Sequence, residues 1–309
     1  MKVYYNLDNY KVHKPVITDG VFDGVHKGHI GILERVKQSA SVIGGESVIV
    51  TFWPHPRIVL HQDASIKLIN TLEEKLQLFE IFGIQHIVIL PFTAEFSKIT
   101  SQQFVEEIMV SKLKVSHLII GFNHHFGKGR EGNFELMKEY SGRFGFTLEK
   151  LDAQIVENEK VSSTLIRQAL DNGDIATANK YLGYEYMITG NVIEGKKIGR
   201  TIGFPTANIK IDHNFKLIPK PGVYAVEVDI AGIRRPGMLN IGYNPTVGTS
   251  PDKLTIEVHI LNFTDDLYHK TITLYFKQRI RNEIKFDGLD QLKQQLNSDK
   301  AEVIKILGE

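Results

Sequence analysis

The sequence predicts two domains of different class, an α/β domain built on a parallel sheet and then an antiparallel β-barrel or sandwich. Two observations predict this division. Up to about residue 182, short apolar runs alternate with stretches whose apolar residues recur every three or four positions, as in buried strands between amphipathic helices. After residue 183 the apolar residues recur at every second position, which is typical of strands with one buried face.

In the first domain, strands and helices are expected to alternate along the chain. Strands are expected at 16–18, 47–52, 86–91 and 117–121. Helices are expected at 28–40, 71–82, 101–112 and 133–144. This alternation predicts a parallel sheet with helices on both faces, and in such sheets ligands bind at the carboxyl ends of the strands.

The second domain is expected to contain at least five strands and a closing helix. The strands are expected at 186–193, 222–229, 236–241, 253–260 and 270–276, and the helix at about 289–307. In the fourth of these strands, Ile256 and Val258 share one face while Glu257 and His259 share the other. The change of pattern places the boundary near residue 182 and predicts domains 1–182 and 183–309.

Composition limits the classes of function. The 309 residues are 42% hydrophobic and 24% charged, which indicates a globular protein. The 37 Lys and Arg nearly balance the 36 Asp and Glu, so no overall charge favours nucleic acid or an anionic membrane. The absence of cysteine excludes disulfides, thiolate nucleophiles and cysteine-ligated zinc. With no signal-like N-terminus and no apolar stretch of roughly 20 residues, we expect a cytoplasmic protein that acts on small molecules; the oligomeric state is left open.

The segment GVFDGVHKGH, residues 20–29, joins the first expected strand to the first expected helix. Glycines before a helix N-terminus let a phosphate approach unpaired backbone N–H groups. His26 and His29, three residues apart, can face one ligand. This suits a transfer at phosphorus with a departing pyrophosphate, in which the protein supplies positioning and charge stabilisation. The alternatives are a purely structural turn and a zinc site, although metal-binding histidine pairs on helices are usually four residues apart.

A second glycine pattern points to a different class of enzyme. Gly127, Gly129 and Gly132 fit G-x-G-x-x-G, and Asp152 follows twenty residues later, as in a dinucleotide-binding dehydrogenase. That motif normally opens directly at the end of a strand, whereas residues 121–126 intervene here. The dehydrogenase interpretation is therefore secondary.

The strongest motif of the second domain is GKKIGRTIGFPTAN, residues 195–208. Its glycines leave room for a phosphate and its cations supply charge. Thr206 and Asn208 place two oxygen donors where they could hold Mg²⁺. Glu257, on the polar face of its strand, could act as a general base. The alternatives are a glycine-rich hairpin and an ordinary solvated glutamate.

Four stretches of the first domain carry a resemblance to a known family. GVFDGVHKGH resembles the H-x-G-H motif of nucleotidyltransferases with a Rossmann-like fold, and F-D-G-V-H narrows it to the adenylyltransferase module of prokaryotic riboflavin kinase/FAD synthetases. TFWPHP (51–56), GFNHHFGKGREG (121–132) and SSTLIR (162–167) follow in the family's order. His124 stands where many members have Phe, and Lys160 where some have Arg.

The resemblance implies the roles of particular residues in this module. His26 and His29 would be catalytic and bind the ATP phosphates. The residues implied to bind nucleotide or flavin are Gly20, Phe22, Asp23, Gly24, Pro54, Pro56, Asn123, Ser162, Ser163, Thr164 and Arg167.

The second domain resembles riboflavin kinase, which implies a six-stranded antiparallel barrel. The resemblance rests on GRTIGFPTAN (199–208), GVYAV (222–226), MLNIGYNPTVG (238–248), TIEVHILNF (255–263) and RIRNEIKF (279–286). It implies that Thr206 and Asn208 hold Mg²⁺ and that Glu257 is the base. The residues implied to bind nucleotide or flavin are Gly195, Lys197, Gly199, Gly203, Pro205, Thr206 and Asn208.

Together the resemblances imply a bifunctional enzyme of flavin cofactor synthesis. The barrel would phosphorylate riboflavin with ATP to FMN, and the first domain would transfer AMP from ATP to FMN, giving FAD and pyrophosphate. Both steps would need Mg²⁺. Two alternatives stay open: a chain with one active site, the kinase, beside a weak adenylyltransferase, and a flavin-binding regulator without turnover.

Overall fold

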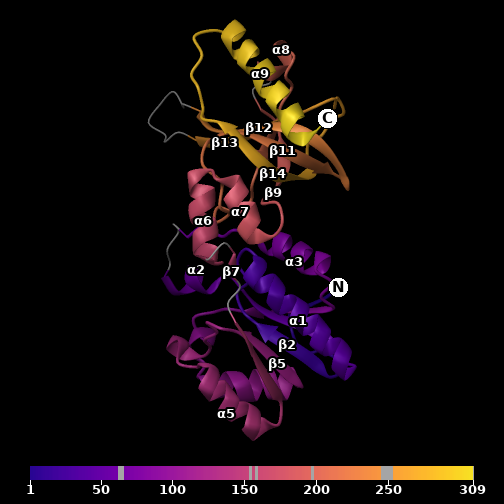
Figure 1. Cartoon of the computed structure of the whole chain (residues 1–309), viewed down its shortest axis with the longest axis vertical. Helices are drawn as coiled ribbons and strands as arrows, with labels where there is room; N and C mark the ends of the chain where they lie inside the picture. Colours follow the sequence, from indigo (N-terminus) through magenta and orange to yellow (C-terminus); the bar gives the residue numbers. More distant parts are fainter. Residues whose placement is uncertain (62–65, 153–154, 157–158, 196–197, 245–252, 309) are drawn as a thin grey trace. The chain divides into compact units, whose positions relative to one another are not determined.

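The computed structural model describes residues 1–61, 66–152, 155–156, 159–195, 198–244 and 253–308. The chain forms two compact units, Met1–Ser162 and Ser163–Glu309 (Figure 1). Helices α6 (Ser163–Asn172) and α7 (Ile175–Leu182) precede the boundary expected near residue 182 and group with the second unit.

The first unit contains a six-stranded parallel sheet in the order β1-β4-β3-β2-β5-β6. The four strands expected from the sequence are confirmed, and they form the centre of the sheet. The sequence missed β1 and β6 because they are edge strands, one only three residues long and the other, TLEKL, half polar. The strands are β1 (Lys2–Tyr4), β2 (Pro15–Asp19), β3 (Glu46–Trp53), β4 (His86–Pro91), β5 (His117–Gly121) and β6 (Thr147–Leu151), with a separate hairpin of β7 (Ile155–Val156) and β8 (Glu159–Lys160).

All four helices expected in the first unit are present. They are α1 (Lys27–Ile43), α3 (Leu72–Ile81), the segment α4 (Ser101–Gln103) with η2 (Phe104–Lys112), and α5 (Phe134–Phe144); shorter helical segments are α2 (Pro56–His61), η1 (Phe96–Lys98) and η3 (Lys128–Arg130). The sequence predicted an α-helix here, but the η2 segment is a π-helix. Within it the Ser111 hydroxyl donates to the carbonyl of Glu106, five residues earlier, at 2.7 Å.

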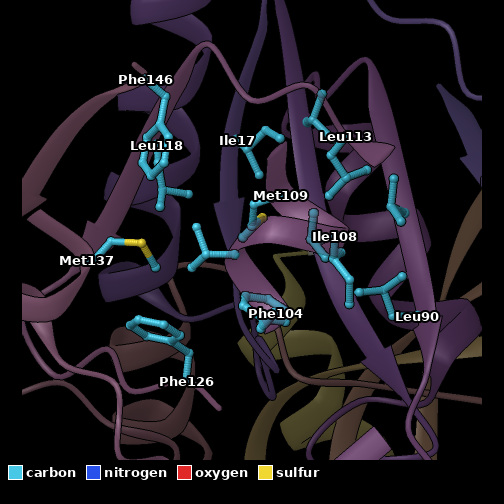
Figure 2. Packing of buried hydrophobic residues seen from close by; sticks show 14 of the residues in the cluster. Ile17, Leu90, Phe104, Ile108, Met109, Leu113, Leu118, Phe126, Met137 and Phe146 are labelled. Atoms are coloured by element: carbon cyan, nitrogen blue, oxygen red, sulfur yellow. The ribbon is translucent and has the colours of Figure 1, made fainter. Parts of the chain in front are cut away.

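Helices cover both faces of the parallel sheet, as predicted. On one face, Val16 of β2 and Ile119 of β5 pack against Val36 and Ala40 of α1. On the other, a larger cluster joins the strands to η2 and α5. Figure 2 shows the labelled members of this cluster, among them Ile17, Leu118, Phe104, Met109 and Met137. Packing on both faces of the sheet holds β2 and α1 in place. The loop that joins them is therefore held as well.

The second unit contains a closed antiparallel barrel in the order β10-β13-β12-β11-β14-β9. The six strands implied by the resemblance are confirmed, and the sandwich alternative is wrong because β9 also pairs with β10. The sequence missed the four-residue β10, which lies in the glycine-rich motif. The strands are β9 (Met187–Ile193), β10 (Ala207–Lys210), β11 (Gly222–Ile230), β12 (Ile233–Asn244), β13 (Lys253–Ile260) and β14 (Thr271–Arg281).

One long helix covers part of the barrel's outer surface. α9 (Leu289–Leu307), predicted over the same residues, packs against β11, β12 and β14 (Figure 1). Its Val303 joins a buried cluster with Phe204, Val223 and Met238. The short helix α8 (Ile198–Thr201) lies in the glycine-rich motif. Among the described residues, no helix is long and apolar enough to cross a membrane.

Candidate active sites

The loop between β2 and α1 carries the first candidate site at the carboxyl edge of the parallel sheet. Gly24 has a φ of 91°, a conformation that favours glycine. A Cβ on Gly20 would lie 3.3 Å from the ring of Phe22, so the loop is tightly folded. His26 occupies the N-cap of α1 without a side-chain capping bond. The first turn of α1 therefore keeps its capacity to bind an anion.

His26 and His29 form a stacked pair at the start of α1. Their ring centroids are 3.7 Å apart and the rings are inclined by 15°. A Cβ on Gly28 would lie 3.1 Å from the His26 ring, so the glycine between them gives the ring room. The Nδ1 atoms of both histidines are buried and have no hydrogen-bond partner within the described part of the chain. Buried polar atoms without a partner are rare, and a bound ligand would supply the missing partners.

Both histidines are neutral near pH 7. Burial lowers the pKa of His26 to about 4, against the opposing charge of Asp23 and a backbone hydrogen bond. Burial also lowers the pKa of His29 well below its usual value, and the nearby charges of His26 and Lys75 lower it further. A bound phosphate would act in the opposite direction and favour protonation.

Two buried charged residues support this loop, Asp23 within the motif and Lys75 outside it. Asp23 is 5% exposed and accepts a hydrogen bond from the backbone N–H of Ile69 at 3.0 Å. Lys75 of α3 is 2% exposed and donates from Nζ to the carbonyl of Val21 at 2.7 Å. Burial lowers the pKa of Lys75 to about 8. Asp23, predicted to bind nucleotide, thus also fixes the loop, and Lys75 was missed by the sequence reasoning.

The remaining predicted residues of this site lie in three segments. Pro54 follows the end of β3, and Pro56 is the first residue of α2. Asn123 is exposed on the loop after β5; a Cβ on Gly121 would lie 3.9 Å from its Oδ1. Thr164 is exposed on α6 of the second unit. Ser162, Ser163 and Arg167, also around the start of α6, are half-buried.

The G-x-G-x-x-G stretch folds as a compact loop rather than as a strand-to-helix turn. A Cβ on Gly132 would lie 2.6 Å from the Phe126 ring, and one on Gly127 would lie 2.6 Å from the backbone of Ser101. Gly129 has a φ of 62° within a short 3₁₀ turn. Gly127 and Gly132 serve close packing, Gly129 allows a positive φ, and the stretch does not open a helix directly at a strand end, which argues against the dehydrogenase interpretation.

The two departures from the resemblance have distinct environments. The His124 ring binds Asp19, with Nε2 3.0 Å from Oδ1 and 2.9 Å from Oδ2. The ammonium of Lys160 lies over the ring of Phe122, 5.5 Å from its centroid. Lys160 therefore retains a cation at the end of the β7–β8 hairpin.

The second candidate site is a cavity on the outer surface of the barrel, bordered by α9. Its volume is about 310 Å³, and its polar lining includes Thr206, Asn240, Glu257 and His259. Leu292 and Leu296 of α9 line it as well, with Phe204 and Met238. An apolar cavity with a few convergent polar groups is typical of small-molecule sites.

Three polar residues form a row across neighbouring strands, and two of them, Glu257 and Asn240, line this cavity. Glu257 of β13 is the register partner of Asn208 on β10 and of Asn240 on β12. Residues directly opposite one another share a face of the sheet. Thr206 Oγ1 lies 3.5 Å from Glu257 Oε2. The structure thus brings together the three residues predicted for metal binding and base chemistry, Thr206, Asn208 and Glu257, and adds Asn240.

The glycines of the second motif allow neighbouring parts of the chain to pack closely against it. A Cβ on Gly195 would lie 2.1 Å from the Asn208 amide nitrogen, and one on Gly199 would lie 2.1 Å from the carbonyl of Phe204. Gly203 has a φ of 86°. Gly199 also lines the cavity. Lys197, predicted to bind nucleotide, lies outside the described residues.

His259 secures the turn that carries Thr206. Its Nδ1 donates to the carbonyl of Pro205 at 2.8 Å, and its ring meets Phe204 edge to face at 5.2 Å. Burial lowers the pKa of His259 and so favours the neutral ring. The sequence pattern had placed His259 on the same strand face as Glu257. That pattern is the signal by which its position near Glu257 could be predicted.

The donor set of Thr206 and Asn208 fits Mg²⁺. Within the described ranges, no group of three or more His, Cys, Asp or Glu is placed to hold an ion. Thr206 and Asn208 instead offer a hydroxyl and an amide oxygen beside a carboxylate. Mg²⁺ prefers such oxygen ligands and keeps several waters and substrate phosphates around it.

Comparison with known proteins covers both units. The FAD synthetase family matches residues 9–165 and the riboflavin kinase family matches residues 182–307. The chain is 39% identical to the bifunctional riboflavin kinase/FMN adenylyltransferase of Listeria monocytogenes, over 94% of this chain and 95% of that protein. It is 34% identical to the protein of the same name from Escherichia coli K12, over 98% and 96%. The chain belongs to the bifunctional riboflavin kinase/FMN adenylyltransferase family.

A solved structure also resembles the chain over nearly its whole length. It is named a macrolide-efflux protein from Streptococcus pneumoniae, is 30% identical, and covers 97% of each chain with a TM-score of 0.87. That name describes the other protein. What it shares with this chain is the arrangement of strands and helices that carries the two candidate sites.

Each candidate site lies in the segment matched by one of the two families. The stacked histidines lie in the segment matched by FAD synthetase, and the row of Asn208, Glu257 and Asn240 lies in the segment matched by riboflavin kinase. Sequence reasoning missed Lys75, Asp19 and Asn240. Lys75 had a signal, because it lies three residues from both Leu72 and Leu78 on the apolar face of its helix. Asn240 had none apart from its polarity within an apolar strand.

Proposed function

We propose which residues of the two sites act in each of the family's two reactions. The chain is a bifunctional enzyme of flavin cofactor synthesis. It phosphorylates riboflavin with ATP to give FMN, and it transfers AMP from ATP to FMN to give FAD and pyrophosphate. Both reactions move a phosphorus centre between oxygens, so the protein's contribution is positioning and charge stabilisation.

In the kinase site, Glu257 is the proposed general base. The 5′-hydroxyl oxygen of riboflavin attacks the γ-phosphorus of ATP, the bond from that phosphorus to the bridging oxygen breaks, and ADP departs. The hydroxyl proton passes to the Glu257 carboxylate. The proposal is supported by the cavity that Glu257 lines and by its position directly across from Asn208.

Mg²⁺ is the proposed metal of the kinase site. Thr206 and Asn208 would hold it, and when bound it neutralises charge on the ATP phosphates. Two glycines let the chain pack closely around these residues: Gly199 lies on the cavity wall, and Gly195 lies against Asn208. His259 keeps the Pro205–Thr206 turn in place through its bond to the carbonyl of Pro205.

In the adenylyltransferase site, His26 and His29 are the proposed phosphate-binding residues. A phosphate oxygen of FMN attacks the α-phosphorus of ATP, the bond to the pyrophosphate oxygen breaks, and no covalent enzyme intermediate forms. The histidines and the N-terminus of α1 stabilise charge on the departing pyrophosphate. The single observation that carries this assignment is the stacked pair with two buried, unpartnered Nδ1 atoms.

The other ligand residues of this reaction are proposals that rest on the family resemblance. We keep Gly20, Phe22, Asp23, Gly24, Pro54, Pro56 and Asn123 as proposed nucleotide- or flavin-binding residues, and Ser162, Ser163, Thr164 and Arg167 as proposed contacts of the triphosphate. Domains 1–182 and 183–309 stay a proposal, as does a cytoplasmic location, where ATP is available for both reactions.

The test is one incubation with separated products. The purified chain is incubated with riboflavin, ATP and Mg²⁺, and FMN and FAD are separated over time. We expect FMN to form first and FAD to follow. Riboflavin left unchanged under varied metal and redox conditions would support the flavin-binding regulator, and FMN without FAD, even when FMN is supplied, would support a chain with one active site.

A further inference from the structure

The ion pair of Asp19 and His124 lies at the same sheet edge as the histidine pair. Asp19 is the last residue of β2, and His124 is on the loop after β5, the parallel neighbour of β2. The side chains are 4% and 8% exposed. Gly20, the first residue of the phosphate-binding motif, directly follows Asp19, so the pair borders the adenylyltransferase site.

Asp19 favours the charged form of the His124 ring. Burial lowers the pKa of His124, but the charge of Asp19 and its hydrogen bond to Nε2 outweigh burial and leave the pKa raised. Both ring nitrogens of a protonated imidazole carry a hydrogen and can donate. Nε2 donates to Asp19, so the second donor, Nδ1, is left for another acceptor.

His124 Nδ1 has no acceptor in the described part of the protein. The atom is buried. The ring packs against Phe126 at 5.7 Å with an inclination of 27°, and a phenyl ring offers no oxygen or nitrogen acceptor. A buried donor without an acceptor costs free energy, and more so when it is charged. The cost is relieved if a ligand supplies the acceptor.

We propose that His124 donates its Nδ1–H to a phosphate oxygen of a substrate in the adenylyltransferase site, while Asp19 holds the ring in place. The acceptor is a phosphate because charged donors bind phosphate oxygens strongly, and both substrates, ATP and FMN, carry phosphates. The inference rests on the proposed adenylyltransferase function. It makes the residue that departs from many relatives a substrate-binding residue of this chain.

The test removes the ion pair without leaving a buried charge. Replacing a buried pair by apolar residues is commonly neutral or stabilising for folding, so the variant is the double substitution Asp19→Leu/His124→Phe. We expect its kcat/KM for FAD formation to fall roughly 10- to 100-fold, the range for a lost charge-assisted hydrogen bond. KM is measured for FMN at saturating ATP and for ATP at saturating FMN, and the substrate whose KM rises is the one that binds His124.

A control substitution is available at the start of β5, the strand that leads into the loop with His124. His117, at the start of β5, binds Thr147 and Glu149. His117→Phe makes the same change at the amino edge of the sheet, and we expect it to leave both KM values unchanged. Riboflavin phosphorylation by the double variant should also match wild type, because the barrel carries that reaction.

A direct readout is independent of turnover. The ¹⁵N NMR signal of His124 Nδ1 should shift when either FMN or the magnesium complex of α,β-methylene ATP is added. A folded double variant with unchanged KM for both substrates, or a His124 signal that moves with neither ligand, overturns the proposal. Wild-type protein that makes no FAD refutes the proposed function instead, and the NMR titration still decides the role of His124.

Discussion

Lys75 donates its ammonium group to the carbonyl of Val21 and so ties α3 to the loop that carries the histidine pair. The ammonium is buried, and its charge helps to keep the pKa of His29 low. Lys75 therefore acts on the loop in two ways, by fixing its backbone and by setting the field around its imidazoles.

Lys75→Met should reduce FAD formation at least tenfold and raise the pKa of His29, because a hydrogen bond to the loop and a nearby positive charge are both lost. Histidine NMR titration measures the second effect, which loop disorder alone would not produce. Lys112→Met, at an exposed lysine of the same unit, is the control. An unchanged His29 pKa in folded Lys75→Met would contradict the electrostatic role.

The same lysine predicts a pH dependence of stability. Its pKa is lowered from 10.5 to about 8 in the folded chain, so between these values the unfolded state binds the extra proton, and stability rises as pH increases. The gain approaches about 3 kcal/mol near pH 10.5. Denaturant unfolding between pH 8 and 10 should show this rise in wild type and lose it in Lys75→Met.

His29→Ala should reduce FAD formation by about 10²-fold or more, the typical loss for one preorganised transition-state donor. FMN formation should persist, since the barrel carries it. Product analysis with riboflavin or FMN as substrate measures both activities. His13→Ala, at an exposed histidine of the same unit, is the control. Near-normal FAD synthesis by folded His26→Ala/His29→Ala protein would show that the pair is structural.

Glu257→Gln should lose on the order of 10²- to 10⁴-fold in riboflavin phosphorylation, because the amide keeps the size of the side chain but cannot accept the proton. Riboflavin affinity should change much less. The variant should still convert supplied FMN to FAD. A glutamate that only faces solvent predicts no change in either quantity, and loss of FMN adenylylation as well would refute the separation of the two sites.

Asp299→Ala should destabilise the second unit by about 3–5 kcal/mol, the cost of leaving a buried charge unpaired. Arg281 Nη2 lies 2.6 Å from Asp299 Oδ2, and the Asp299 side chain is fully buried. Denaturant unfolding measures the loss. The exposed Glu302–Lys305 pair on the same helix is the comparison, and Glu302→Gln should change stability by less than about 1 kcal/mol.

A fragment of residues 163–309 should be more stable than one of residues 184–309, although both should phosphorylate riboflavin. The Asn179 side chain of α7 donates to the carbonyl of Phe276 at 2.8 Å and accepts from the N–H of Tyr186 at 2.7 Å, and the shorter fragment loses both bonds. Thermal unfolding of the two fragments measures the difference. Equal melting temperatures would place the functional boundary near residue 182.

The sequence predicted the helices and strands that are buried on one face or on both faces, because these have a regular pattern of apolar residues. β2, β3, β4 and β5 are central and apolar, and α9 keeps its helical pattern along its whole length. Edge strands and short strands were missed, because β6 mixes Glu149 and Lys150 with apolar residues and β10 has four residues. Period alone could not tell a barrel from a sandwich, since that depends on the pairing of β9 with β10.

The site residues were predictable where a motif places them on one segment. His26 and His29 are three residues apart, and Thr206 and Asn208 two. Lys75 and Asp19 act through contacts with Val21 and His124, which lie 54 and 105 positions away. Contacts between residues so far apart in the sequence cannot be predicted from local spacing, so they were found only in the structure.

Closure of the barrel has a consequence for handling the protein. A closed sheet has no free edge in its described strands, whereas the parallel sheet ends at β1 and β6. An edge strand can pair with another molecule, and charged side chains along it oppose that pairing. β6 carries Glu149 and Lys150, while β1 has only Lys2 as a charged side chain. Aggregation during heating or concentration should therefore begin in the first unit, through β1.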